Sequence, residues 1–297
     1  MGAPVVLVDK GGLPVILSEN GRGTPVEVAE NGFGTAITIV GEGGAPVVLI
    51  SAPIANNFDP VSYLGTDLIE FWDASRADTI FALTDATYTN AVHSWTGLVT
   101  GANLAQTTPN LKPYYDPAGL SGSPCLTFNS TSQYLKCTDA ALMALLPSGT
   151  DPCEIWALCS QDMAATDATT RHVAGYANSS LANGRSLARI PVSSVNRARA
   201  YMGTGASAGV ATDTHVDLSG VHVMRGIFGA TQTSIQVDGE ALATATVTPA
   251  TGAPAFFMVG SIPALAASNW WGGKIGAVMV TKPLTSQQAT DLHSYFG

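Results

Sequence analysis

The residues best suited to ligand chemistry form an aromatic pair near the C-terminus, in Asn269-Trp270-Trp271-Gly272-Gly273. Indole faces stack on the apolar faces of sugar rings, and a neighbouring amide can form hydrogen bonds with sugar hydroxyl groups. Side chains that are neighbours on a strand point to opposite faces. We therefore expect one tryptophan of the pair to be buried and only the other to be available to a ligand.

A second group of polar and aromatic residues flanks a predicted loop at 178–184. Its members are Tyr176, Asn178, Asn183 and Arg185. Amide and guanidinium groups around such a loop suit the rim of a site for a hydroxylated ligand. Together with residues 269–271, they form the predicted carbohydrate-binding set.

Glycoside hydrolysis requires two carboxylates at one bond, about 5–5.5 Å apart in retaining enzymes and about 6.5–9.5 Å apart in inverting ones. Two carboxylates separated by one residue on a strand would satisfy the shorter distance, but the sequence has no Glu-x-Asp pair. Asp213 and Asp217 are four positions apart, about 13 Å on an extended strand. We therefore predict no enzymatic activity, with a polysaccharide depolymerase kept as an alternative.

Three potential metal ligands alternate in Asp213-Thr214-His215-Val216-Asp217. On a strand, Asp213, His215 and Asp217 would share one face. Oxygen-rich sites bind calcium, so a calcium site is one interpretation of this pattern. A solvated strand face is the other interpretation and the one we favour, so we predict no required cofactor.

The four cysteines, Cys125, Cys137, Cys153 and Cys159, contain no CxxC pair. A zinc site is therefore not expected, and buried free thiols are the simplest interpretation. Cys125 and Cys137 could face each other on neighbouring strands, which leaves a disulfide between them open.

Composition limits the classes of partner. Charged residues make up 12% of the chain and hydrophobic residues 46%, which indicates an ordered, β-rich protein. The net charge of −9 argues against nucleic-acid binding, which depends on Lys and Arg. The only basic concentration is Arg185, Arg189, Arg197 and Arg199. No stretch resembles a targeting segment or a membrane helix, so we expect cytoplasmic synthesis without membrane insertion.

The elements that must position these residues are short and widely spaced, as in an all-β sandwich. Strand-like runs occur at 68–73, 125–128, 154–160, 172–177, 186–190, 199–202, 215–218, 222–228, 234–237, 256–259 and 274–280. Helices are predicted at 140–146 and 286–295, the second with Thr285 as its N-cap. We assign residues 63–297 to this domain and residues 51–62 to a linker.

Residues 2–50 repeat a short pattern of Gly, a small or apolar residue, Pro and a β-branched run. The units are headed by Pro4, Pro14, Pro25, Ala36 and Pro46, at spacings of 10, 11, 11 and 10 residues. Each unit predicts a strand that ends at a turn dipeptide such as Asn20-Gly21. Runs such as 5–8 are apolar on both faces, and so short a segment cannot cover them alone. We interpret residues 1–50 as a β-repeat stem for anchoring and oligomerisation.

A series of short motifs occurs in a recognisable order beyond the linker. The motifs are Phe71-Trp72-Asp73-Ala74-Ser75, Ser94-Trp95-Thr96-Gly97, Lys112-Pro113-Tyr114-Tyr115, Val237-Asp238-Gly239-Glu240 and Lys274-Ile275-Gly276-Ala277-Val278. This order resembles the concanavalin A-like (laminin-G-like) jelly-roll domains of lectins and of bacteriophage fibres and spikes. The resemblance implies two packed antiparallel sheets that bind glycans, and assembly as a trimer or another homo-oligomer.

The repeated stem joined to such a domain resembles the fibre and head-spike proteins of phages and gene transfer agents. We therefore predict a non-enzymatic component on the surface of a virion or phage-like particle, synthesised in the bacterial cytoplasm. Its repeats would attach it to other virion proteins, and its jelly-roll would bind host capsule or lipopolysaccharide. A purely structural decoration protein is an alternative, as is the depolymerase.

Overall fold

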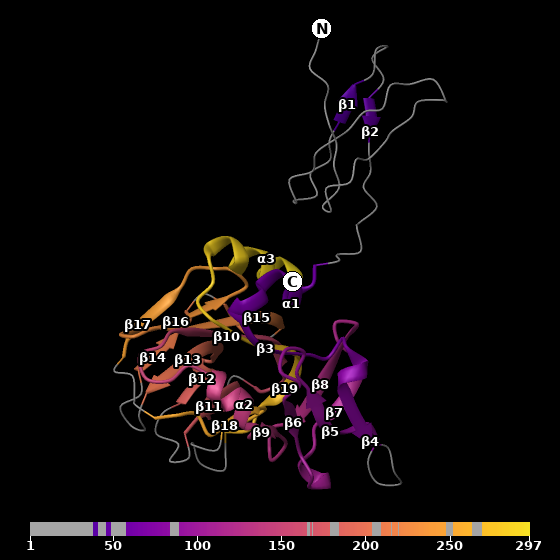
Figure 1. Cartoon of the computed structure of the whole chain (residues 1–297), viewed down its shortest axis with the longest axis vertical. Coiled ribbons are helices and arrows are strands. Elements are labelled where there is room, and N and C mark those ends of the chain that lie inside the picture. Colours follow the sequence, from indigo (N-terminus) through magenta and orange to yellow (C-terminus); the bar gives the residue numbers. More distant parts are fainter. Residues whose placement is uncertain are drawn as a thin grey trace. The chain divides into compact units, whose positions relative to one another are not determined.

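The computed structural model describes residues 38–40, 46–48, 58–83, 89–164, 167, 169–178, 184–203, 209–214, 216–218, 220–247, 252–262 and 269–297. The chain divides into two compact units, Met1–Phe58 and Asp59–Gly297 (Figure 1). Among the described residues, no helix is both long and apolar enough to cross a membrane.

Unit 1 contains one described strand pair. Strand β1 (Thr38–Val40) pairs antiparallel with β2 (Pro46–Val48). Strand β2 begins at Pro46, the head of its repeat unit, as expected where proline supplies no ladder hydrogen bond. The other repeat units lie outside the described residues, so oligomerisation through the stem stays a prediction.

Unit 2 is a β-sandwich, as the sequence predicts. Its first layer, sheet A, has the strand order β17-β16-β15-β10-β19-β3. The strands are β17 (Ala243–Thr246), β16 (Gln232–Val237), β15 (Val221–Phe228), β10 (Cys153–Gln161), β19 (Gly272–Thr281) and β3 (Leu68–Asp73). All of these neighbours are antiparallel.

The second layer, sheet B, has the order β14-β13-β12-β11-β18-β9-β6-β5-β4. The strands are β14 (Gly209–Thr212), β13 (Val195–Gly203), β12 (Gly184–Val192), β11 (Arg171–Ala177), β18 (Phe256–Val259), β9 (Leu135–Cys137), β6 (Asn103–Ala105), β5 (Ala91–Thr96) and β4 (Ile80–Leu83). Strands β8 (Ser123–Asn129) and β7 (Tyr114–Leu120) join the layers, because β8 pairs with β19 and β7 pairs with β5.

The core lies between the two layers. Trp72 of sheet A stacks on Phe257 of sheet B, with ring centroids 4.9 Å apart. Trp72, Trp95 and Trp156 are each fully buried. Trp156 lies on the outer face of sheet A, where its ring contacts His293 of helix α3 (Ser286–Phe296) at 5.0 Å.

The helices are short, and side chains cap their N-termini. Thr285 and Gln288 form a capping box at the start of α3, as the sequence predicts for Thr285. Asp139 caps α2 (Ala140–Leu145) and Asp59 caps α1 (Pro60–Leu64), so α1 begins within the range predicted as linker. Single 3₁₀ turns occur at Gly65–Asp67, Ala77–Thr79 and Pro109–Leu111.

One predicted strand is wrong. Strand β14 ends at Thr212, and residues 216–218 are not in a strand. The cause is local: a carboxylate oxygen of Asp213 accepts the N–H of Val216 at 2.8 Å, which turns the chain out of the ladder. The Leu218 N–H then donates to the Asn196 carbonyl at 3.0 Å.

Two hairpin turns use backbone torsions in the left-handed region. Asp238 (φ 50°) and Gly239 (φ 76°) form the turn after β16, where Asp-Gly predicts one. Ser193 (φ 51°) and Ser194 (φ 63°) form the two-residue turn between β12 and β13. Serine adopts this region at a cost, because its Cβ crowds the following carbonyl.

We predict that Ser194→Gly stabilises unit 2 by about 1 kcal/mol, because glycine removes the crowding at this exposed turn. For a domain of this size, thermal denaturation should show an increase in Tm of about 2–4 °C. The same substitution at exposed Ser294, inside α3, should instead lower stability by about 0.5 kcal/mol. An equal change in Tm for both variants would contradict the assignment of strain to the turn.

Candidate functional site

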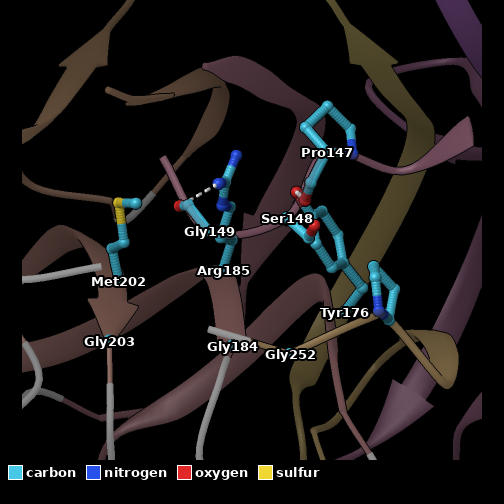
Figure 2. Close-up of a pocket in the computed structure, with 10 residues that line it drawn as sticks. Pro147, Ser148, Gly149, Tyr176, Gly184, Arg185, Met202, Gly203 and Gly252 are labelled. Atoms are coloured by element: carbon cyan, nitrogen blue, oxygen red, sulfur yellow. Dashed lines mark hydrogen bonds between the residues drawn. The ribbon is translucent and has the colours of Figure 1, made fainter. Parts of the chain in front are cut away.

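Two predicted rim residues, Tyr176 and Arg185, lie side by side on paired strands β11 and β12. Both are buried, with 2% and 4% of their surface exposed. The Tyr176 hydroxyl donates to the Pro147 carbonyl at 2.8 Å. The Arg185 guanidinium donates to the carbonyls of Asp151 and Gly149 at 2.6 and 2.9 Å; Figure 2 shows its bond to Gly149. These side chains therefore hold the turn at 147–151.

The pocket beside them is too small for a sugar. Pro147, Gly149, Met202 and Pro254 are among the residues that line it (Figure 2), and its volume is about 10 Å³. That is about the space of one water molecule. Burial raises the pKa of Tyr176 well above its usual value, so its hydroxyl stays neutral. In this structure the pair supports a loop from within.

The two remaining members of the predicted rim group are Asn178 and Asn183. Asn178 is half-buried directly after β11. Asn183 lies outside the described residues.

The tryptophan pair divides as the sequence predicts. Trp271 is 1% exposed and belongs to the core, and its backbone N–H donates to the Gly260 carbonyl at 2.8 Å. Trp270 is half-buried, and its ring stacks on Tyr134, with centroids 5.4 Å apart and planes at 26°. Asn269 is half-buried, and its carbonyl accepts the N–H of His172 at 3.2 Å. We call Trp270 and Tyr134 the aromatic platform.

Arg171, the first residue of β11, supports the platform from behind. Its Nη1 donates to the carbonyls of Ser130 and Trp270 at 2.8 and 3.2 Å. Its Nε and Nη2 donate to Asp167 Oδ2 at 3.0 and 2.7 Å. One guanidinium therefore fixes the backbone of Trp270 relative to the turn that leads to Tyr134.

Asp167 in turn is held by its neighbours. Burial opposes its ionisation, but the Thr169 N–H and the Arg171 guanidinium outweigh burial and hold the pKa of this carboxyl below its usual value. Arg189, which is fully buried, donates to the carbonyls of Asp167 and Ala164 at 2.9 and 2.8 Å. The loop before β11 is thus tied to the sheet by two arginines.

A basic and aromatic row lies on the outer face of β13. Tyr201, Arg199 and Arg197 pair with Ser186, Ala188 and Ile190 of β12, and all three row residues are half-buried. Arg199 donates to the Tyr201 hydroxyl at 2.8 Å and to Thr212 Oγ1 at 2.9 Å. We call Arg197, Arg199 and Tyr201 the β13 row.

The β13 row approaches the aromatic platform through one residue. The Tyr201 hydroxyl lies 3.4 Å from Thr170 Oγ1, and Thr170 precedes Arg171, which binds the Trp270 carbonyl. Of the four arginines concentrated in the sequence, Arg197 and Arg199 thus face outward, whereas Arg185 and Arg189 are buried. The alternation Arg197-Ala198-Arg199-Ala200-Tyr201 is the sequence signal for this row.

The predicted metal ligands do not share a strand face. Asp213 is fully buried and accepts the Val216 N–H, whereas Asp217 is exposed in an irregular segment. His215 lies outside the described residues. Within the part of the chain that the structure describes, no group of three His, Cys, Asp or Glu residues could hold a metal ion.

Two buried carboxylates are occupied by the protein itself. Glu70 accepts the N–H groups of Val99 and Thr100 at 2.9 and 3.2 Å, and also the Thr100 hydroxyl. Glu154 accepts two hydrogen bonds from Arg225, at 2.8 and 2.9 Å. These contacts are structural, because they consume the oxygens that a general acid or base would present. The cysteines Cys125, Cys137, Cys153 and Cys159 are buried and free.

No model of a known protein family matches the chain, and no curated protein matches it. Among solved structures, HCR/D-Sa-GBL1/C is 10% identical over 74% of this chain and 52% of that chain, with a TM-score of 0.50. Trypanosoma rangeli sialidase is 15% identical over 76% of this chain and 33% of that chain (TM-score 0.46). The CBM40 domain of Ruminococcus gnavus IT-sialidase, bound to α2,3-sialyllactose, is 10% identical over 58% and 96% (TM-score 0.46).

These matches concern the fold alone. The chain spans 33% of the length of the sialidase. It spans 52% of the length of another solved structure that it matches, of botulinum neurotoxin type C. The β-sandwich follows from the strand pairing of this chain, and the match to HCR/D-Sa-GBL1/C agrees with it.

The buried imidazole of His172 makes the stability of the fold depend on pH. It is fully buried, and its Nδ1 lies 3.0 Å from Ser186 Oγ. Burial, with the charge of Arg199, lowers the pKa of His172 to about 3. An unfolded histidine takes up a proton near pH 6.5. Stability from neutral His172 is therefore complete above pH 6.5 and is lost progressively as the pH falls from 6.5 towards 3.

We predict that His172 costs the native state about 2 kcal/mol at pH 5 relative to pH 7. The free energy of unfolding of wild type minus that of His172→Gln should therefore be smaller at pH 5 than at pH 7 by that amount. Carboxylates that titrate in the same range are present in both proteins, so their contribution cancels in this difference. Chemical denaturation at both pH values measures the difference. An NMR titration in which His172 protonates near pH 6.5 in the folded protein would contradict this account.

Proposed function

We propose that this chain is a non-enzymatic carbohydrate-binding protein that uses the aromatic platform of Trp270 and Tyr134. The observation that carries the proposal is the partly exposed stack held by the Arg171 guanidinium. An aromatic surface fixed before binding contributes contact area to a sugar ring at little entropic cost. The amide of Asn269 lies next to it in the chain and supplies polar contacts.

The β13 row extends this surface with hydrogen-bond donors. Arg197 and Arg199 carry five N–H donors each, of which two of Arg199 are committed to Tyr201 and Thr212. Sugar hydroxyls and carboxylates both accept such bonds. A ligand of several sugar units is therefore favoured over a single sugar, with ring stacking at the platform and polar contacts along the row. Tyr176 and Arg185 act behind this surface by shaping the 147–151 turn.

The finer proposal is a fibre or spike protein on a virion or phage-like particle that binds host capsule or lipopolysaccharide. The period of the N-terminal repeat supports it, because short apolar units require cover from other chains. Copies held together by the stem would bind a surface polysaccharide through avidity, which compensates for a modest affinity per site.

We predict that the full chain binds polysaccharide on a glycan array and that Trp270→Ala lowers the affinity at least about 5-fold, since aromatic contacts of this kind contribute about 1 kcal/mol or more. Because Trp270 is half-buried, the variant should remain folded. Trp271→Ala is the matched control: it removes a core side chain and should lower stability by about 3–5 kcal/mol.

The alternatives predict different results. A decoration protein would bind no glycan, and Trp270→Ala would then leave adsorption to host cells unchanged. A depolymerase would release new reducing ends when incubated with the bound polysaccharide. Either result would overturn the proposal.

A further inference from the structure

We infer that unit 2 has a second binding site, for an uncharged and hydroxyl-rich ligand, between helix α3 and strands β15–β16. A pocket of about 640 Å³ lies there. This volume is within the range of about 300–1,000 Å³ that is usual for small-molecule sites. Figure 1 shows α3 beside β15 and β10, on the opposite side of the sandwich from β11 and β18. The pocket shares no lining residue with the aromatic platform.

The pocket results from the way α3 packs on sheet A. The helix is anchored by buried Ala289 and Leu292, and Phe296 contacts Phe71 with centroids 6.2 Å apart. Phe71 belongs to β3, and the His293 ring packs on Trp156 of β10 at 5.0 Å. The other side of α3, with Thr290, stands opposite the hairpin of β15 and β16 and leaves a gap.

The charge of Arg225 at the floor of the pocket is paired with the carboxylate of Glu154. Arg225 donates to both carboxylate oxygens of Glu154, and its Nη1 donates to Gln236 Oε1 at 3.1 Å. The Gln236 Nε2 donates to the Glu240 carbonyl at 2.8 Å. Because the guanidinium charge is paired within the protein, the floor offers no free cation to an anionic ligand, and the net charge of −9 disfavours one further.

The walls mainly present acceptors, because their donors are already used. The Thr290 hydroxyl donates to the Ser286 carbonyl at 3.0 Å, and the Ser294 hydroxyl donates to the Thr290 carbonyl at 3.1 Å. The carboxylate of Asp238 accepts from His222 and from the Val223 N–H, which leaves part of its acceptor capacity open.

His293 lies beside these walls but presents no accessible nitrogen acceptor to a ligand. Its Nε2 lies 3.4 Å from Gln236 Oε1, which already accepts from Arg225, so Nε2 must be the donor. The neutral ring then has an unprotonated Nδ1, which is buried without a hydrogen-bond partner. Burial and the nearby Arg225 lower the pKa of His293, which favours this neutral form.

This arrangement selects the class of ligand. An acceptor-rich wall requires a ligand with many donors, which excludes apolar molecules and inorganic anions. Leu242, which is 49% exposed at the rim, and Ile227 offer contact to C–H surfaces. Neutral sugars and related polyols combine hydroxyl donors with such a surface.

The test is an NMR titration of the full chain with methyl β-D-galactopyranoside and methyl α-D-mannopyranoside. Amide shifts should saturate in the millimolar range for at least one of them and be confined to α3 and the β15–β16 hairpin. Glucuronic acid, the anionic comparator, should bind at least about 10-fold more weakly, in line with unfavourable desolvation of an unpaired charge.

Variants locate the site. Thr290→Trp should fill the pocket and abolish the shifts, whereas Gln287→Trp, an exposed position of the same helix outside the pocket lining, should leave them unchanged. Asp238→Asn keeps the left-handed turn, which asparagine tolerates, and should weaken binding about 10-fold by removing a charged acceptor.

The outcomes separate this site from the proposed function. Trp270→Ala should leave the α3 shifts intact even where it abolishes polysaccharide binding. Absence of saturable shifts with both glycosides would overturn the inference, as would equal shifts in wild type and Thr290→Trp. If Thr290→Trp does not fold, unchanged affinity in Asp238→Asn would still overturn it.

Discussion

The structure depends on buried guanidinium groups that satisfy the carbonyls of its loops. Arg185 and Arg189 occupy alternate positions of β12 that face the interior, four residues apart, which is about 13 Å along a strand. One therefore reaches the turn at 147–151, and the other reaches the loop before β11. Buried carbonyls without partners would be costly, and arginine can serve several of them with one planar fork. In a chain with few charged residues, these two charges are used to hold loops against sheet B.

A guanidinium group that binds backbone carbonyls also shapes the candidate site. Arg171 plays this part at the aromatic platform, because its Nη1 donates to the Ser130 and Trp270 carbonyls. Asp167 pairs with the charge of this guanidinium. The backbone under Trp270 is thus fixed by the β11 end of sheet B, and the ring rests on Tyr134. Orientation is set before a ligand arrives, so less binding energy is lost to ordering. On the opposite side, Arg225 forms an ion pair with Glu154 beneath α3 and lines the pocket there.

Sequence periodicity could predict the fold and part of the site. The long strand β19 and the capped helix α3 were predicted closely. One tryptophan of the pair 270–271 is buried, as predicted, although both residues lie before β19 and not within a strand. Short strands such as β6 and β9 have three residues each, too few to show a period. Local pattern also could not show that Tyr134, distant in sequence, stacks on Trp270, or that α3 leaves a pocket against β15 and β16. The predicted strand at 215–218 failed because the Asp213 side chain competes with the ladder for a backbone N–H.

The central claim is that a polysaccharide contacts Trp270 and leaves the buried indoles untouched. The chain has five tryptophans, and Trp72, Trp95, Trp156 and Trp271 are each at most 1% exposed. In protein labelled with ¹⁵N-tryptophan, each indole N–H should give its own NMR signal. Addition of the polysaccharide bound on the array should shift the Trp270 signal and leave the other four in place. Binding without movement of the Trp270 signal would contradict the account.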